Sequence, residues 1–212
     1  MNKIIFRKGF TAEPVPPEIK KIIVGNSYKE NPNIAVSDLA YLKVRHYNFA
    51  HETAEGELIV SAKLAREVLE IFSELYDNEY EIEKIRLVDY YDSDDKKSMS
   101  DNNSSAFNYR KVANTDTISM HSFGRAIDIN PLINPYIVGD KIMPANGVQY
   151  SDRNLAFLHK IDHDDICYKI FISHGWKWGG DWCNSKDYQH FYKDVKRPFR
   201  AVLRRIKAIS GR

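Results

Sequence analysis

The chain has 212 residues, enough for one domain with a sizeable hydrophobic core. Its 43% of hydrophobic and 28% of charged residues are typical of a globular domain, and the net charge of +2 excludes a strong general attraction to nucleic acid. Two cysteines, Cys167 and Cys183, are too few for a disulfide framework. They could pair, or Cys183 could lie near a metal, but two independent thiols are the default.

The N-terminus carries no recognisable targeting segment. Charged residues interrupt the apolar run at residues 4–6 after three positions, whereas a signal peptide needs about 7–15 apolar residues. No run approaches the ~18 apolar residues of a membrane helix. The sequence therefore predicts neither a signal peptide nor a membrane span.

Residues 1–36 contain four prolines, which predicts an extended N-terminal arm with one short helix near residues 18–24. We expect this arm to pack on a main domain of residues 37–212. The nearly continuous apolarity of residues 37–49 indicates a buried strand. We expect His46 and His51 to be structural or exposed and not to bind a metal.

The clearest helix is predicted over residues 61–76, where apolar residues recur at three- and four-residue steps and Ser61 could serve as the N-cap. This helix belongs to the core. Residues 82–91 are rich in branched and aromatic residues and predict a strand. Acidic residues close this segment, namely Asp89, Asp92, Asp94 and Asp95. They are expected in a solvated loop, and cation binding is the alternative.

A histidine and a carboxylate, His121 and Asp128, lie seven residues apart with Gly124 between them. Seven extended residues span roughly 23 Å, whereas two ligands of one zinc ion each lie about 2.0–2.2 Å from the metal. The chain must therefore turn back, which Gly124 permits. Residues 126–129 then alternate like a strand with Asp128 opposite two isoleucines, and Pro131 ends the pairing. Taken alone, this segment also suits a structural histidine at the core edge.

Residues 130–150 are expected to form a long loop that shapes a groove. Two helical pieces are predicted between residues 152 and 174, with Gly175 as the stop. His159 and His163 have the four-residue spacing of a rival metal site. The position after His159 is a lysine, however, and not the glutamate of the H-E-x-x-H motif, so an exposed pair is the default.

A glycine- and tryptophan-rich segment precedes a second pair of candidate ligands. It contains Trp176, Trp178 and Trp182, and most of these tryptophans are expected to pack in the core. Gly179 and Gly180 would let the backbone approach a cleft closely. Asp187 and His190 follow. With the first pair they supply the three ligands and the separate base that a catalytic zinc ion requires.

The chain beyond Asp194 is basic and contains no acidic residue. An amphipathic helix is predicted there, beginning near Pro198. A solvated charged face is the main interpretation, and contact with an anionic polymer is the alternative.

The pattern Ser119, His121, Gly124, Ala126 and Asp128, followed by Asp187 and His190, resembles a family of zinc peptidases. These are the zinc D-alanyl-D-alanine carboxypeptidases and L-alanyl-D-glutamate peptidases, which cut bacterial cell-wall stem peptides and are related to the vancomycin-resistance D,D-peptidases. The resemblance also covers residues 102–110 and 175–182, hence roughly the C-terminal half of the chain, and is fainter in the N-terminal part.

The resemblance implies a single α+β domain with a hedgehog/D,D-peptidase-like fold. A small antiparallel sheet flanked by helices would carry the metal. The implied cofactor is Zn²⁺, held by His121, Asp128 and His190, with a fourth position free for water.

The resemblance also implies roles for three further residues. Asp187 would act as the general base, and Arg110 would hold the substrate carbonyl as it gains negative charge. Ser119 would lie near the substrate. A structural carboxylate at Asp187 and an ordinary surface arginine at Arg110 are the competing interpretations.

The implied function is hydrolysis of peptidoglycan stem peptides, of the D-Ala-D-Ala carboxypeptidase or L-Ala-D-Glu endopeptidase type, by a monomer at the cell wall or outside the cell. Without a signal peptide, the chain would be a processed or truncated form or a phage-type lysin. One alternative is a non-catalytic zinc module that binds wall peptides or a protein partner. A nucleic-acid binder using the basic tail is disfavoured by the nearly neutral net charge.

Overall fold

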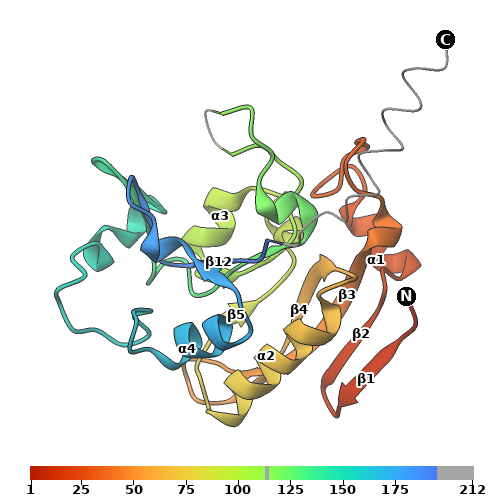
Figure 1. The fold of residues 1–212 in the computed structure, drawn as a ribbon, viewed down its shortest axis with the longest axis horizontal. Coiled ribbons are helices and arrows are strands. Elements are labelled where there is room, and N and C mark those ends of the chain that lie inside the picture. The colour runs from red at the N-terminus through yellow and green to blue at the C-terminus, as the bar shows by residue number, and fades with distance from the viewer. Residues whose placement is uncertain (113–114, 195–212) are drawn as a thin grey trace.

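A four-stranded antiparallel sheet in the order β1-β2-β3-β4 forms one half of the computed structural model, which describes residues 1–112 and 115–194 (Figure 1). Its strands are β1 (Ile4–Arg7), β2 (Phe10–Pro14), β3 (Leu39–Tyr47) and β4 (Thr53–Ser61). The segment expected to be an extended arm thus adds two strands to this sheet. Helix α1 (Pro17–Ile23) forms where the short helix was predicted.

The central strand β3 is buried on both faces, which explains its nearly continuous apolarity. Leu42 and Val44 point into the main core, to which helix α2 (Ala65–Asp77) also contributes. Leu39 and Tyr41 point into a second cluster that includes residues of α1. The buried strand predicted for this segment is confirmed.

Helix α2 starts four residues later than predicted. Ser61 is not its N-cap but the last residue of β4, and the Ser61 N–H donates to the Gly124 carbonyl at 2.8 Å. The apolar stripe of the helix faces the core as expected and consists of fully or almost fully buried side chains: Val68, Leu69, Phe72 and Leu75.

The strand predicted for residues 82–91 is wrong for most of its length. Only β5 (Lys84–Ile85) forms there, in parallel with β6 (Asn103–Ser104), and a 3-10 turn, η2 (Val88–Tyr91), follows. The Asn103 side chain binds both backbone groups of Arg86, at 2.8 Å and 3.1 Å, where the next ladder pair would form. The strand therefore ends at Ile85.

The acidic residues after this strand have structural partners. The Asp89 carboxylate accepts hydrogen bonds from the N–H and hydroxyl of Ser27. Asp94 caps helix α3 (Asp95–Ser100) by accepting from two backbone N–H groups. No group of metal-ligating side chains forms in this part of the described chain.

The other half of the fold contains two small antiparallel sheets. One has the order β10-β12-β7, and the other the order β11-β8-β9. Their strands are β7 (Ala126–Asp128), β8 (Tyr136–Val138), β9 (Lys141–Met143), β10 (Lys177–Trp178), β11 (Lys186–Asp187) and β12 (His190–Tyr192). Antiparallel sheets combined with helices confirm the mixed α and β class, whereas the hedgehog-like fold stays a prediction.

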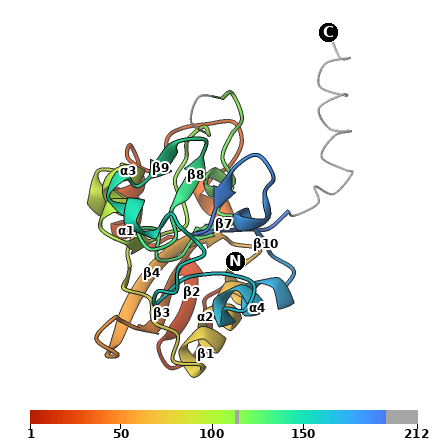
Figure 2. The same cartoon turned by 90° about the vertical axis from the view of Figure 1, so that its left-hand side faces the viewer.

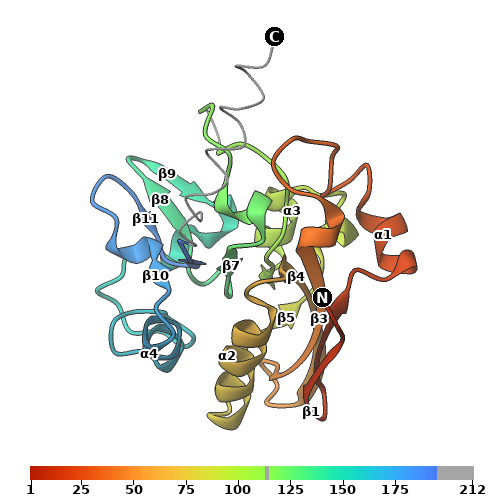
Figure 3. The same ribbon diagram turned by 45° about the vertical axis from the view of Figure 1, so that its right-hand side comes forward.

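The segment 130–150, predicted to be a long loop, contains the β8–β9 hairpin and a 3-10 turn, η4 (Ala145–Tyr150). Figures 2 and 3 show this hairpin at the end of the molecule away from α2 and α4 (Ile166–Ser173). β8 pairs with β11, opposite Asp187. The hairpin therefore supports one of the candidate site residues.

Of the two helical pieces predicted between residues 152 and 174, only the second forms, as α4, while residues 152–165 make turns. Gly175 follows with a φ of 73°, as expected of a helix stop. The helix predicted near Pro198 lies outside the described residues. Within them, no helix is long and apolar enough to span a bilayer.

Candidate metal centre

Three of the predicted ligands converge on one point. His121 lies in the 3-10 turn η3 (Met120–Phe123), Asp128 ends β7 and His190 begins β12. Asp128 and His190 are directly paired in the antiparallel ladder. The distance from Asp128 Oδ2 to His121 Nε2 is 3.2 Å, and that from Asp128 Oδ1 to His190 Nδ1 is 2.9 Å. The ligand atoms of all three lie within 4.8 Å of one another.

Gly124 brings about the chain reversal between His121 and Asp128. Its φ of +60° lies in the left-handed region, and a Cβ built on it would lie 2.4 Å from the backbone nitrogen of Ser61. The end of β4 therefore packs directly against the turn that carries His121. The glycine is needed both for its backbone conformation and for this close approach.

The segment around β6 holds the first two ligands in place. The Ala106 carbonyl lies 2.5 Å from His121 Nδ1. Ser105 and Asp128 exchange backbone hydrogen bonds, at 3.1 Å and 2.9 Å. Because His121 Nδ1 donates its proton to Ala106, the Nε2 atom of the neutral ring carries a lone pair directed at the cluster.

The donor set fits a bound cation. His121 Nε2 lies 3.2 Å from a carboxylate oxygen of Asp128 and 3.1 Å from His190 Nδ1, so the three side chains direct possible ligand atoms at one point. Tetrahedral ligands at ~2.0–2.1 Å from zinc lie roughly 3.3 Å from one another, close to the separations found here. Two imidazoles and one carboxylate are also the ligand types of catalytic zinc sites.

The electrostatics keep Asp128 charged. Burial alone would raise the pKa of its carboxyl, but the charges and hydrogen bonds of the two histidines outweigh burial and hold that pKa well below its usual range. Burial likewise disfavours protonation of His121, and Asp128 outweighs it, so the pKa of His121 is raised. The centre thus combines a charged carboxylate with two imidazole rings.

Asp187 lies beside this centre, in β11. A Cβ on Gly179 would lie 2.8 Å from the Asp187 Cβ and 3.3 Å from the His190 Cβ, so the absence of a side chain at Gly179 lets both residues pack there. The Gln189 amide donates to Asp187 Oδ1 at 3.1 Å. Burial raises the pKa of the Asp187 carboxyl, the nearby charge of Asp128 raises it further, and His190 opposes both.

Arg110 and Ser119 both contact the turn that carries His121. The Ser119 hydroxyl accepts from the His121 N–H at 3.3 Å and caps the turn, and the Ser119 N–H donates to the Arg110 carbonyl at 3.0 Å. The Arg110 guanidinium pairs with Asp95. Ser119 is buried, and its contact with substrate stays a prediction.

The rival ligand candidates do not converge. His159 stacks on Phe49 with ring centroids 3.7 Å apart, while His163 pairs with Asp181 at 2.8 Å. His46 is buried against the Ile82 carbonyl and His51 is exposed, as expected. In the described residues, no second group of metal-ligating side chains forms.

The cysteines and tryptophans behave as expected. Both cysteines are free, one of them buried and the other exposed. Trp176 and Trp178 are core residues. The Trp182 ring lies 5.5 Å from the His190 ring, and its indole N–H donates to the Tyr192 hydroxyl at 3.2 Å.

Two side chains at the site were not predicted from the sequence, namely Asp95 and Gln189. Asp95 lies in the acidic stretch interpreted as a loop, and only the fold brings it to Arg110. Gln189 lies inside the second motif, between Asp187 and His190, and this position in the sequence could have indicated that it belongs to the site.

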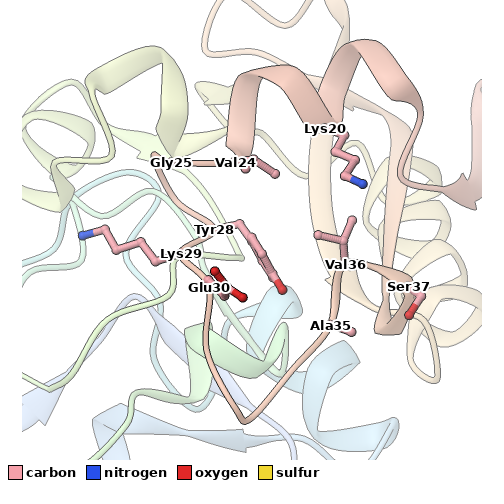
Figure 4. Close-up of a pocket in the computed structure, with 9 residues that line it drawn as sticks. All are labelled: Lys20, Val24, Gly25, Tyr28, Lys29, Glu30, Ala35, Val36 and Ser37. Atoms are coloured by element: carbon pink, nitrogen blue, oxygen red, sulfur yellow. The ribbon is translucent and has the colours of Figure 1, made fainter.

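The surface pocket drawn in Figure 4 has a volume of about 700 Å³ and is not part of this centre. All its lining residues lie between Lys20 and Ser37, so it contains none of the candidate ligands. The pocket is therefore separate from His121, Asp128 and His190.

Residues 113–193 match a family model described as D-alanyl-D-alanine carboxypeptidase. No match was found among curated proteins or among solved structures. The matched range contains His121, Asp128, Asp187 and His190, whereas Arg110 and Asp95 precede it.

Proposed function

On the premise that residues 113–193 belong to the D-alanyl-D-alanine carboxypeptidase family, as predicted from the sequence, we propose that the chain is a zinc-dependent peptidase of bacterial cell-wall stem peptides. The family match supports a hydrolase that acts on peptide bonds. The zinc dependence, the substrate and the residue roles are our proposal.

The observation that carries the proposal is the convergence of His121 Nε2, His190 Nδ1 and the Asp128 carboxylate on one buried point. These residues would hold the ion through two nitrogens and one oxygen. A zinc ion so held supplies Lewis-acid chemistry to a peptide carbonyl and to water. Three protein ligands leave a coordination position open, as catalytic zinc sites do and structural sites do not.

Asp187 is the proposed general base. Its Oδ1 atom accepts a hydrogen bond from Gln189, which leaves Oδ2 to take a proton from the attacking water. The same oxygen would then pass that proton to the leaving amine. The raised pKa of the buried carboxyl suits a group that must both accept and donate a proton near neutral pH.

Arg110 is the proposed electrophilic partner. A guanidinium is permanently charged and offers several N–H donors in one plane, so it can stabilise the oxygen of the substrate carbonyl as negative charge develops there. Ser119 would help by fixing the turn between Arg110 and His121 and by lying near the substrate.

The proposed partner is a peptidoglycan stem peptide, and the proposed place of action is the cell wall or the outside of the cell. We propose that the chain acts as a monomer. Both the removal of a terminal D-alanine and the cleavage between L-alanine and D-glutamate are consistent with the ligand geometry.

The test is to incubate the zinc-loaded protein with purified peptidoglycan, to quantify new amino termini and to measure the masses of the released fragments. We expect new termini that disappear when a chelator removes the metal, and the fragment masses will name the bond. Zinc binding and peptide binding without new termini would instead support a non-catalytic zinc module.

A further inference from the structure

We propose that Asp95, at the start of α3, is a positioning residue that anchors Arg110 through its Nε atom. Asp95 Oδ2 pairs with Arg110 Nε, and Asp95 Oδ1 accepts from the Asn108 amide at 2.8 Å. Both carboxylate oxygens are thus engaged, one by the arginine and one by a buried residue two positions before it. The inference rests on the proposed function for its catalytic consequence, but not for the anchoring itself.

The backbone of Arg110 is fixed by the turn that carries His121. The Arg110 N–H donates to the Ser122 hydroxyl at 2.8 Å, and the Arg110 carbonyl accepts from the Ser119 N–H at 3.0 Å. Asp95 fixes the other end of the side chain. An arginine held at both its backbone and its Nε has few rotamers left, so its guanidinium has one orientation relative to the metal centre.

The pairing through Nε leaves the two terminal nitrogens of Arg110 for another partner. Within residues 1–112 and 115–194, neither of them has a hydrogen-bond acceptor, although the side chain is only about one third exposed, at 35%. A guanidinium with both terminal amino groups uncommitted can receive one or two oxygens in a fork. Asp95 therefore orients the arginine without occupying the groups that would bind the substrate.

A second ion pair near the start of α3 provides a contrast. Lys97 and Asp92 pair at 2.7 Å, but their side chains are 58% and 83% exposed, so that pair adds little to stability or geometry. The Asp95 side chain is more buried, with only 27% of it exposed, and it also accepts a hydrogen bond from Asn108. Removing the charge of Asp92 is consequently the matched control for removing the charge of Asp95.

The first experiment measures turnover of purified peptidoglycan by Asp95→Asn, Asp95→Glu and the control Asp92→Asn. We expect Asp95→Asn to lower kcat/KM by about ten- to hundredfold, because the guanidinium of Arg110 loses the ion pair that positions it. Its zinc content should not change, Asp95→Glu should recover part of the loss, and Asp92→Asn should behave as wild type. A wild-type rate in Asp95→Asn would overturn the proposal.

A double-mutant cycle separates positioning from a general effect on the fold. If Asp95 acts through Arg110, then Asp95→Asn should cause no further loss in the Arg110→Ala background. An equal loss in both backgrounds would assign Asp95 another role and overturn the proposal.

A readout that needs no activity keeps the anchoring testable on its own. In ¹H–¹⁵N spectra, the Nε–H signal of Arg110, assigned by its loss in Arg110→Lys, should be protected from exchange in the wild type and exposed in Asp95→Asn. Equal exchange rates would overturn the anchoring. If instead the wild type does not cut peptidoglycan while this signal behaves as expected, the proposed function fails and the anchoring stands.

Discussion

Asp128 has the most constrained side chain of the candidate centre. Its two oxygens face different histidines, and its backbone pairs with Ser105 on one side and His190 on the other. A carboxylate held from both sides can present its charge to an ion without rearrangement. Among the described residues, Asp187 has by contrast one hydrogen-bond partner, at one of its two oxygens, and the other oxygen can exchange a proton.

This difference predicts that metal binding and turnover can be separated by substitution. His121→Ala should lose both zinc and activity, because it removes one of three ligands. Asp187→Ala should keep zinc while kcat falls by about 10²–10⁴-fold, the usual contribution of a general base. Zinc content by elemental analysis and cleavage of peptidoglycan measure the two effects. Retained cleavage in Asp187→Ala would remove this residue from the base role.

Gly124 allows a test of the turn between the ligands. Gly124→Ala combines an unfavourable positive φ with a Cβ 2.4 Å from the Ser61 nitrogen, and should cost about 2–5 kcal/mol of stability. Gly139 is the matched control, because it also has a positive φ, 53°, but nothing within 4 Å of the added Cβ. Gly139→Ala should cost only about 1–2 kcal/mol. Urea unfolding compares the two, and equal costs would contradict the close approach.

Elements with a continuous hydrophobic pattern could be predicted from the sequence, and short elements could not. The stripe of α2 and the doubly buried β3 are encoded by their own residues. β5 and β6 have two residues each, and their extent is decided by the Asn103 side chain. The β8–β9 hairpin forms against β11, which is almost fifty residues further along the chain. A local pattern carries no information about such partners.

The site follows the same rule. The convergence of His121, Asp128 and His190 could be predicted because two short motifs resemble those of a known zinc-peptidase family, and the role of these residues as metal ligands stays a prediction. The side chains that support them could not be predicted, since Asp95 and the Ala106 carbonyl reach Arg110 and His121 only through the fold.

Helix α3 supports two of the proposed catalytic groups from one face. Asp95 and Met99 are four residues apart and so lie on the same side of the helix. Asp95 holds Arg110, while Met99 Sδ lies 3.5 Å from the Gln189 amide that binds Asp187. Through these contacts, α3 helps to fix the orientation of both the Arg110 guanidinium and the Asp187 carboxylate.

Gln189→Met should slow the enzyme without destabilising it. Among the described residues, the buried Gln189 Oε1 atom has no hydrogen-bond partner, which costs the fold about 1–3 kcal/mol. Replacing the amide with an apolar side chain of similar shape removes this cost together with the hydrogen bond to Asp187. We expect kcat to fall about tenfold while the unfolding temperature stays the same or rises. Met99→Leu keeps the packing and removes only the weak sulfur acceptor of the Gln189 amide, so it should lower kcat by less than Gln189→Met does.

At the scale of the whole molecule, the centre joins segments that are far apart in the sequence. The candidate ligands come from η3, β7 and β12, and the end of β4 packs against the turn before β7. An ion bound by these segments therefore crosslinks them, and its binding free energy adds to the stability of the native state.

Zinc should consequently raise the unfolding temperature. At a free concentration about 100 times the Kd, binding adds roughly 2.7 kcal/mol, which corresponds to about 5–10 °C for a chain of this size. Scanning calorimetry with zinc and with a chelator measures the shift. His163→Ala should keep it and His121→Ala should abolish it. The opposite result would move the metal to the rival pair.

The Ala106 carbonyl accepts a hydrogen bond from His121, and the Ser105 carbonyl accepts one from the Asp128 N–H. Both acceptors lie before the stretch that bears the family signature, residues 113–193. A graft of that stretch alone into another protein would leave behind the carbonyl that fixes the imidazole and the strand that steadies the carboxylate. The recognisable signature is thus shorter than the smallest piece of polypeptide able to do the chemistry.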